Sequence, residues 1–117
     1  MSKSYLEITQ RVNLGMKKLH ASRGATLKGF SDMARAATED GALSKKTKEL
    51  IALAIGVSSH CDACIGFHTK ALIKLGVTRE EFEEALGMAV YMGGGPSLMY
   101  AADAMHAYEE LLDHNNR

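Results

Sequence analysis

The sequence has no tryptophan, a single proline, few aromatic residues and no excess of either charge. Lys and Arg together number 14, as do Asp and Glu, so the formal net charge is zero. Such a chain lacks the strongly basic surface with which proteins bind nucleic acids or anionic membranes. The longest apolar run, Leu50–Val57, is far shorter than the roughly 18 residues that a membrane-spanning helix needs. We therefore expect neither nucleic acid nor membrane among its partners.

The length and the cysteine content indicate the number of domains and the role of the cysteines. A chain of 117 residues is long enough for one domain with a modest core, and we expect residues 1–117 to form a single domain. The first residues, Met1–Glu7, lack the basic-then-apolar layout of a signal peptide, so the expected compartment is the cytoplasm. Structural disulfides are rare there, and the only two cysteines, Cys61 and Cys64, are therefore better explained by redox activity or metal binding.

The periodicity of the apolar residues predicts an all-α fold. No strand-like alternation of useful length is present, and the β-branched residues are scattered. We expect about six helices in one compact unit. They cover about residues 4–19, 25–38, 45–57, 61–75, 78–92 and 96–112, and the segment Ser22–Gly24 separates the first two.

Several residues mark the ends of these helices. Thr78 and Glu81 have the spacing of a capping box, in which each side chain bonds the other residue's backbone N–H. Gly76 is a natural residue to end the preceding helix, and Pro96 fits the first position of the last one. Because Leu50–Val57 is apolar all round, we expect its helix to be buried on all sides. The apolar face expected for the last helix comprises Leu98, Ala101, Ala102, Met105, Tyr108 and Leu112.

The two cysteines lie beside groups that can activate a thiol. In a helix beginning near Cys61, residues Cys61, Cys64 and His68 share one stripe, whereas His60 points away from it. Glu49 precedes Cys61 by twelve residues and adds a carboxylate. The spacing therefore favours His68 over His60 as the partner of the thiols.

Thiol chemistry requires the thiolate, and a free cysteine has a pKa of about 8.5. A helix N-terminus stabilises a nearby negative charge by roughly 0.3–1 kcal/mol, which is less than the roughly 1.36 kcal/mol that one pKa unit represents. The helix dipole alone is therefore too weak. His68 can take the thiol proton and Glu49 can orient its imidazole, an arrangement typical of an activated nucleophile.

Two other interpretations of the cysteines remain open. Zinc prefers such ligands, and Cys61, Cys64 and His68 with either Glu49 or His60 would make four. A second CxxC or HxxxH motif is absent, however. Alternatively, both cysteines are simply buried structural residues, since free cysteine is often buried. The remaining histidines, His20, His106 and His114, look like ordinary polar positions, although His106 lies on the last helix and can approach the site.

The combined motif resembles a known family. Glu49, eleven intervening residues, Cys61-x-x-Cys64, three more residues and His68 match the redox signature of the alkylhydroperoxidase D-like proteins of the carboxymuconolactone decarboxylase superfamily. The flanking segments Lys45–Ala54, His68–Leu72, Leu75–Thr78 and Tyr91–Pro96 agree with it. The resemblance covers roughly residues 30–111.

The resemblance implies a fold, an assembly and a role for each residue. The fold would be all-α with a helical-hairpin core, and the subunits would assemble as a homo-trimer or homo-hexamer. Cys64 would attack the peroxide and Cys61 would resolve the sulfenic acid into a Cys61–Cys64 disulfide. His68 and Glu49 would relay the proton through a water, and an external dithiol or lipoyl-type carrier would reduce the disulfide.

We therefore predict a thiol-dependent peroxidase or disulfide oxidoreductase that acts on organic hydroperoxides and needs no cofactor. Some active members of the family carry a second histidine between the cysteines, where this chain has Ala63. The lactone decarboxylases of the superfamily generally lack the CxxC pair. The two alternatives are a lactone enzyme whose activity survives loss of both cysteines, and a non-catalytic redox-sensing subunit whose disulfide alters its packing. The small size of the domain favours an oligomer in any case.

Overall fold

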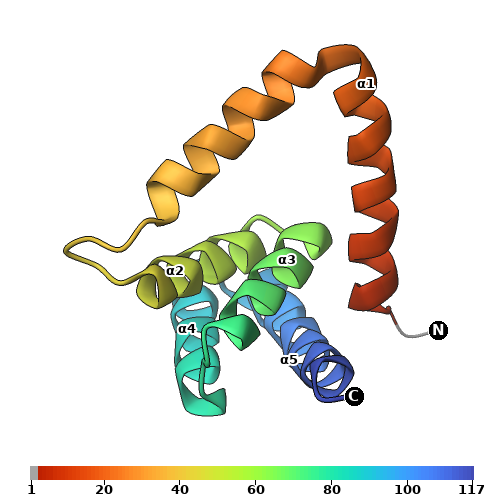
Figure 1. Cartoon of the computed structure of the whole chain (residues 1–117). Coiled ribbons are helices and arrows are strands. Elements are labelled where there is room, and N and C mark those ends of the chain that lie inside the picture. The colour runs from red at the N-terminus through yellow and green to blue at the C-terminus, as the bar shows by residue number, and fades with distance from the viewer. Residues whose placement is uncertain (1–2) are drawn as a thin grey trace.

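The computed structural model describes residues 3–117. Over these residues the chain forms five α-helices and no strand (Figure 1): α1 Tyr5–Thr38, α2 Lys45–Ser58, α3 Asp62–Lys74, α4 Arg79–Gly93 and α5 Gly95–Asn115. The prediction of an all-α chain is confirmed. None of the helices in the described part is long and apolar enough to cross a membrane.

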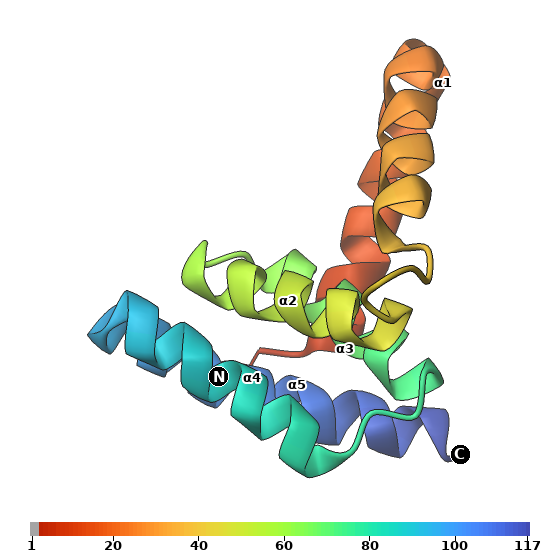
Figure 2. The ribbon, with the colours of Figure 1, turned by 90° about the vertical axis from the view of Figure 1, so that its left-hand side faces the viewer.

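Helices α2 to α5 make a two-layer bundle. The hairpin of α2 and α3 lies across the antiparallel pair α4 and α5, as Figure 2 shows. The core lies between the layers, and Leu53, Ile65 and Phe82 have no exposed surface. Each helix contributes to this core at helical spacing, which is why the sequence periodicity predicted it.

Local signals set the helix ends as the sequence predicts. Thr78 and Glu81 form both hydrogen bonds of the capping box at the start of α4. Ser44 caps α2 by accepting the N–H of Thr47. Gly76, which follows the C-cap Leu75 of α3, adopts a positive φ of 76°, a conformation that glycine tolerates without strain.

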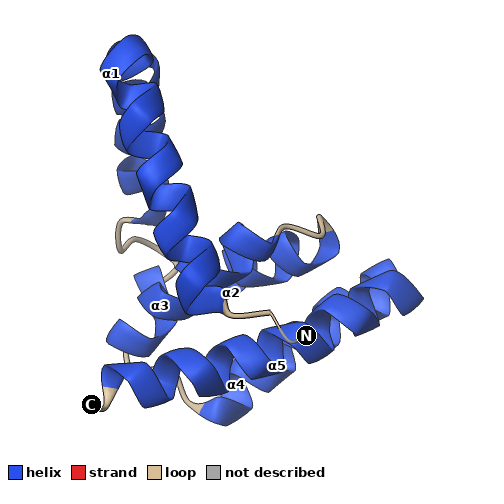
Figure 3. Ribbon diagram, turned by 90° about the vertical axis from the view of Figure 1, so that its right-hand side faces the viewer, coloured by secondary structure: helices blue, strands red, loops and turns tan. Residues whose placement is uncertain are grey.

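The break predicted at Ser22–Gly24 is a kink within a single helix, α1. Arg23 leaves helical geometry, with φ −135° and ψ 44°, and α1 bends sharply there. The bend divides α1 into two limbs that project from the bundle (Figure 3). Only Tyr5 and Thr9 of α1 are buried. The sequence therefore located the break correctly, although the backbone continues as a helix on both sides of it.

Two predicted apolar faces need correction. The helix that contains Leu50–Val57 is not buried on all sides, because Ile51 is 46% exposed and Ile55 is 60% exposed in this chain. Its inner face, which includes Leu53 and Val57, packs against α3 and α4. In α5, Leu98 and Ala102 are exposed, and the buried side chains are Ser97, Ala101, Ala104, Ala107, Tyr108 and Leu111. The buried face of α5 is therefore made largely of alanines. Their small side chains give a weak hydrophobic signal in the sequence, and the prediction therefore favoured the larger apolar residues.

Candidate functional site

The two cysteines lie at the start of α3. Cys61 is the N-cap residue, and its Sγ accepts a hydrogen bond from the backbone N–H of Cys64 at 3.1 Å. The two sulfurs are joined in a disulfide, and the Cα atoms are 5.2 Å apart. Both residues are partly exposed. The pair is therefore placed where an external thiol or a small oxidant can reach it.

His68 and Glu49 form a hydrogen-bonded pair between α3 and α2. The imidazole Nδ1 lies 2.6 Å from the Oε1 atom of Glu49, and the side chains are 32% and 8% exposed, respectively. With Glu49 ionised, Nδ1 carries the proton and donates it, which leaves Nε2 as the acceptor. A buried carboxylate thus holds a half-buried imidazole in one orientation.

The hairpin of α2 and α3 brings these groups together. Gly56 of α2 lies against Cys64, so close that a Cβ added to Gly56 would be 3.1 Å from the Cβ of Cys64. Two turns earlier on α2, Glu49 lies opposite His68, which is one turn beyond Cys64 on α3. The antiparallel arrangement therefore places the carboxylate, the imidazole and the cysteine pair along one seam.

A second polar cluster surrounds Asp62, the first residue of α3. Its Oδ1 accepts hydrogen bonds from the Tyr5 hydroxyl at 3.2 Å and from Lys3 Nζ at 3.1 Å. Lys3 also donates to Asp103 of α5 at 2.9 Å. Burial, with the nearby charges of Asp62 and Asp103, raises the pKa of the Tyr5 hydroxyl. Sequence reasoning missed this cluster, because its members are far apart in the chain and share no motif.

His60 takes no part in the Glu49 pair. It has a positive φ of 56° just before α3. Its ring stacks on Tyr100 of α5, with the centroids 4.6 Å apart and the planes at 12°. The structure thus brings His68, rather than His60, to the carboxylate. His106 and the other two remaining histidines, His20 and His114, are exposed.

Residues 3–117 contain no group of three or more His, Cys, Asp or Glu side chains arranged to hold a metal ion. Cys61 and Cys64 bond to one another, and His68 and Glu49 form a separate pair. In this disulfide form, the four side chains of the zinc interpretation are therefore not arranged around a common point.

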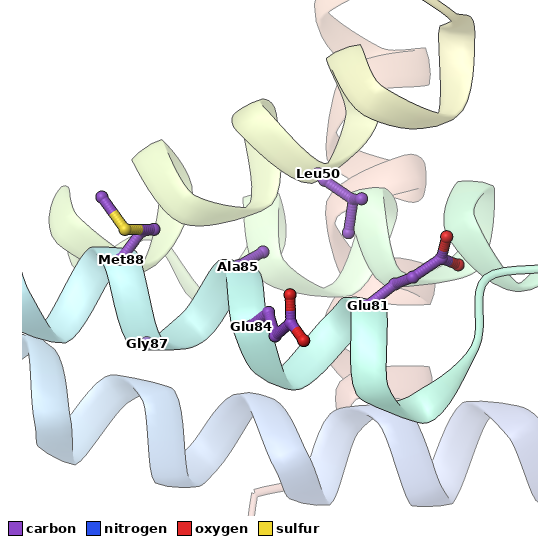
Figure 4. A pocket seen from close by; sticks show the side chains of 6 residues that line it. All are labelled: Leu50, Glu81, Glu84, Ala85, Gly87 and Met88. Carbon is purple, nitrogen blue, oxygen red and sulfur yellow. The ribbon is translucent and has the colours of Figure 1, made fainter.

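An open groove of about 660 Å³ lies between α2 and α4 (Figure 4). Leu50, the neighbour of Glu49, points into it from α2, and Ala85 and Met88 line it from α4. Two carboxylates line its α4 side: Glu84, and Glu81, which is paired with Lys46 of α2 at 2.9 Å. The groove contains no thiol or imidazole and is therefore distinct from the cysteine site.

Comparisons with known proteins agree with one another. A sequence profile described as the Carboxymuconolactone decarboxylase family matches residues 24–107. The crystal structure of a carboxymuconolactone decarboxylase family protein from Legionella pneumophila is 55% identical, with a TM-score of 0.90, and the match covers 92% of this chain and 96% of that one.

Two further relatives are more distant. A Thermotoga maritima protein, described as a carboxymuconolactone decarboxylase family protein possibly involved in antioxidative response, has 32% identity and a TM-score of 0.72. That match covers 79% of this chain and 95% of the Thermotoga chain. An uncharacterized protein of Cupriavidus necator is 38% identical over 100 residues, which are 86% of this chain and 88% of that protein.

Proposed function

Because the chain belongs to the carboxymuconolactone decarboxylase family, we propose that it is an alkylhydroperoxidase D-like thiol peroxidase that reduces organic hydroperoxides. The observation that carries the proposal is the Cys61–Cys64 disulfide one helical turn from a histidine that a buried carboxylate orients. A family name alone does not decide the reaction. The side chains at this site are those that thiol redox chemistry requires.

In the first step the Cys64 thiolate attacks one oxygen of the hydroperoxide and the O–O bond breaks. Cys64 becomes a sulfenic acid, and the alkoxide takes a proton and leaves as an alcohol. The Cys61 thiol then condenses with the sulfenic acid, forming the disulfide and releasing water. The dithiol thus loses two electrons, and the peroxide becomes an alcohol and water.

His68 moves the proton in this scheme. It follows Cys64 by four residues on the same helix, so the two side chains share one face of α3. Its Nδ1 is engaged by Glu49, and Nε2 is the nitrogen left to take the thiol proton and deliver it to the departing alkoxide. Glu49 acts through the imidazole, as an orienting residue.

The position of Cys64 supports it as the attacking residue. Cys61 is the N-cap, and its sulfur faces the backbone N–H of Cys64. Cys64 is nearer to His68 along the helix, and Gly56 leaves it room against α2. We therefore assign attack to Cys64 and resolution to Cys61.

An external dithiol, of which a lipoyl group is one example, restores the reduced enzyme by thiol–disulfide exchange. The partly exposed cysteines at the N-terminus of α3 are accessible to such a carrier. Ala63 stands between the cysteines, where some alkylhydroperoxidase D-like proteins carry a histidine. In this chain His68 and Glu49 therefore carry the proton transfer without that second imidazole. The antioxidative response suggested for the Thermotoga relative is consistent with this chemistry.

The test is a thiol count with intact mass, made on the reduced protein before and after one equivalent of cumene hydroperoxide, with a metal chelator present. We expect both thiols to disappear and one intramolecular disulfide to form as the alcohol accumulates. Cys61→Ser should still consume one equivalent and retain a sulfenic acid at Cys64. Cys64→Ser should consume peroxide at least about 1000-fold more slowly.

Three outcomes would contradict the proposal. Full peroxidase activity in Cys64→Ser would show that the mechanism is wrong. Turnover of a carboxylated lactone by a protein lacking both cysteines would favour the decarboxylase alternative. Stoichiometric oxidation that no dithiol carrier makes catalytic would favour the redox-sensing subunit.

A further inference from the structure

Two residues at the start of α1 close over the first turn of α3, the turn that carries the cysteine pair. We define the N-terminal clamp as Lys3 and Tyr5. Lys3 Nζ and the Tyr5 hydroxyl both donate to the Oδ1 atom of Asp62, at 3.1 Å and 3.2 Å. Asp62 follows Cys61 directly and is one of the two residues between the cysteines. Two donors that are distant in the sequence thus converge on a carboxylate inside the CxxC motif.

Other contacts hold the clamp in place without the Lys3 ammonium. The backbone N–H of Tyr5 donates to Glu110 Oε1 of α5 at 2.7 Å, and the Ser4 hydroxyl donates to Oε2 of the same carboxylate at 2.6 Å. The Tyr5 side chain is 1% exposed and packs beside Gly66 of α3. The start of α1 therefore stays docked when the charge of Lys3 is removed, and that charge can be tested separately from the fold.

Lys3 is shared between two carboxylates. In addition to Asp62, its Nζ donates to Asp103 Oδ2 of α5 at 2.9 Å. The hydrogen bonds to Asp103 and Asp62 raise the pKa of Lys3, which is therefore positively charged throughout the neutral range. One positive and two negative charges leave these three groups with a net charge of −1.

The other titratable groups around the first two turns of α3 come from each helix that packs there. They are Asp62 and His68 on α3, Glu49 on α2, His60 in the preceding loop, Tyr100 and Asp103 on α5, and the clamp. The charge of Glu49 is engaged by the imidazole of His68. Within this set, Asp62 is the carboxylate nearest to the cysteines along the chain, and Lys3 is the cation bound to it.

A carboxylate inside the CxxC motif opposes ionisation of the thiols, because a nearby like charge disfavours the ionised form. A partly exposed charge a few ångströms away changes a pKa by about 0.5–1. The Lys3 ammonium offsets the charge of Asp62, and both side chains are partly exposed. The offset is therefore moderate and sensitive to salt. It affects the rate of any reaction that requires the thiolate.

We propose that Lys3 is a positioning residue of the redox site, which binds Asp62 and thereby favours the Cys64 thiolate. It acts through the Asp62 carboxylate, by offsetting a negative charge that the motif itself carries. The proposal rests on the proposed peroxidase function for the identity of the attacking thiol. Its effect on thiol ionisation is measured without peroxide, so that the two proposals can fail separately.

The test is the rate at which iodoacetamide alkylates the reduced full-length protein as a function of pH, followed by intact mass. All variants carry Cys61→Ser, so that Cys64 is the single thiol. Lys3→Met removes the charge and keeps the aliphatic stem, and we expect the midpoint of the profile to rise by about 0.5–1 pH unit. Asp62→Asn should lower the midpoint by a similar amount. In the Lys3→Met/Asp62→Asn variant the two shifts should offset each other.

Two matched controls separate the charge from other effects of substitution. Lys3→Arg retains the charge and should keep the midpoint of the parent protein. Lys28→Met removes a lysine that is paired with Asp32 on the second limb of α1, and it should leave the midpoint unchanged. In 1 M NaCl the shift in Lys3→Met should shrink, because salt screens a partly exposed charge.

With both cysteines present, Lys3→Met should consume cumene hydroperoxide about 3- to 10-fold more slowly at pH 7, in proportion to its smaller thiolate fraction. Three results would overturn the role of Lys3: an unchanged midpoint in Lys3→Met, shifts of the same sign in Lys3→Met and Asp62→Asn, or a shift that 1 M NaCl does not reduce. A wild type that consumes no peroxide would overturn the peroxidase proposal instead, and the alkylation profiles would still decide whether Lys3 controls ionisation of the thiol.

Discussion

The Nδ1 atom of His68 lies 2.6 Å from the Oε1 atom of Glu49, although the two residues are 19 positions apart and belong to different helices. Nearly all of the carboxylate is buried, while about a third of the imidazole is exposed. The buried Glu49 carboxylate therefore holds the more exposed His68 imidazole in one orientation.

Loss of the Glu49 charge should slow peroxide reduction without unfolding the protein. Glu49→Gln retains the shape of the side chain but no longer favours the tautomer that leaves Nε2 free, and we expect kcat/KM to fall about 10- to 100-fold. Stopped-flow peroxide consumption would measure this. Glu80→Gln, an exposed carboxylate of α4, serves as the control and should have no effect.

The same pair permits a double-mutant cycle. If Glu49 acts through His68, the loss in Glu49→Gln/His68→Gln should be close to that of His68→Gln alone, because the second change removes a group that no longer has a partner. Strictly additive losses in log(kcat/KM) would show that Glu49 acts independently of the imidazole.

Gly66 should not tolerate a side chain. A Cβ added there would lie 2.6 Å from the Cγ2 atom of Thr9, where α1 packs on the back of α3. We expect Gly66→Ala to lower the free energy of unfolding by about 1–3 kcal/mol, because the two helices must separate. Gly87→Ala is the matched control, since its Cβ meets nothing within 4 Å, and should stabilise the protein by about 0.5–1 kcal/mol. Urea unfolding would distinguish the two.

Tyr5 should make stability depend on alkaline pH. The raised pKa of its hydroxyl, caused mainly by burial, means that the folded state prefers the neutral phenol. The contribution of the Tyr5 hydroxyl to the free energy of unfolding is therefore complete below the ordinary pKa of 10.0. This contribution declines as the pH rises from there through the raised pKa. Tyr5→Phe should be less stable than wild type at about pH 8, by about 1–2 kcal/mol, because it loses the hydrogen bond to Asp62.

As the pH is raised above 10.0, the difference in unfolding free energy between wild type and Tyr5→Phe should shrink, because only the wild type must keep this phenol protonated. Chemical unfolding over a series of pH values would measure the trend. Tyr91→Phe, which changes a tyrosine that is 77% exposed, should show a constant difference. A constant difference for Tyr5→Phe would contradict the assignment.

The capping box of α4 should contribute measurably to stability. The Thr78 hydroxyl accepts the N–H of Glu81 at 3.1 Å, and the Glu81 carboxylate accepts the N–H of Thr78 at 2.9 Å. Thr78→Ala should lower the free energy of unfolding by about 1 kcal/mol, and Thr78→Ser should retain most of it because its hydroxyl can make the same bond. Equal losses in the two variants would assign the effect to the methyl group instead.

Local signals explain what could be predicted from the sequence. The capping box at Thr78, the glycine at Gly76 and the break near Arg23 depend on a few consecutive residues, and the structure has each of them in its predicted place. The spacing of Cys64 and His68 likewise follows from one helix. The Glu49 contact joins two helices, so the sequence nominated Glu49 as the residue that orients His68 but could not place the two side chains together.

Long-range packing explains what could not be predicted. The cluster of Tyr5, Asp62 and Asp103 assembles from α1, α3 and α5, and no periodicity reports such a contact. The exposure of Ile51 and Ile55 was missed for a related reason. An apolar run shows that a surface avoids water, but it does not show whether its own chain covers that surface.

The N-cap of α3 has a consequence for observing this protein. The atom that accepts the Cys64 N–H is the Cys61 sulfur, which is also an atom of the disulfide. Reduction breaks the bond that ties the Cys61 sulfur to Cys64, so the position and the chemical form of the atom that accepts this N–H change with the redox state of the pair. The protection of the Cys64 backbone amide against hydrogen exchange should therefore differ between the disulfide and the dithiol forms of the protein. That amide would serve as a built-in spectroscopic reporter, readable by NMR without any label or substrate.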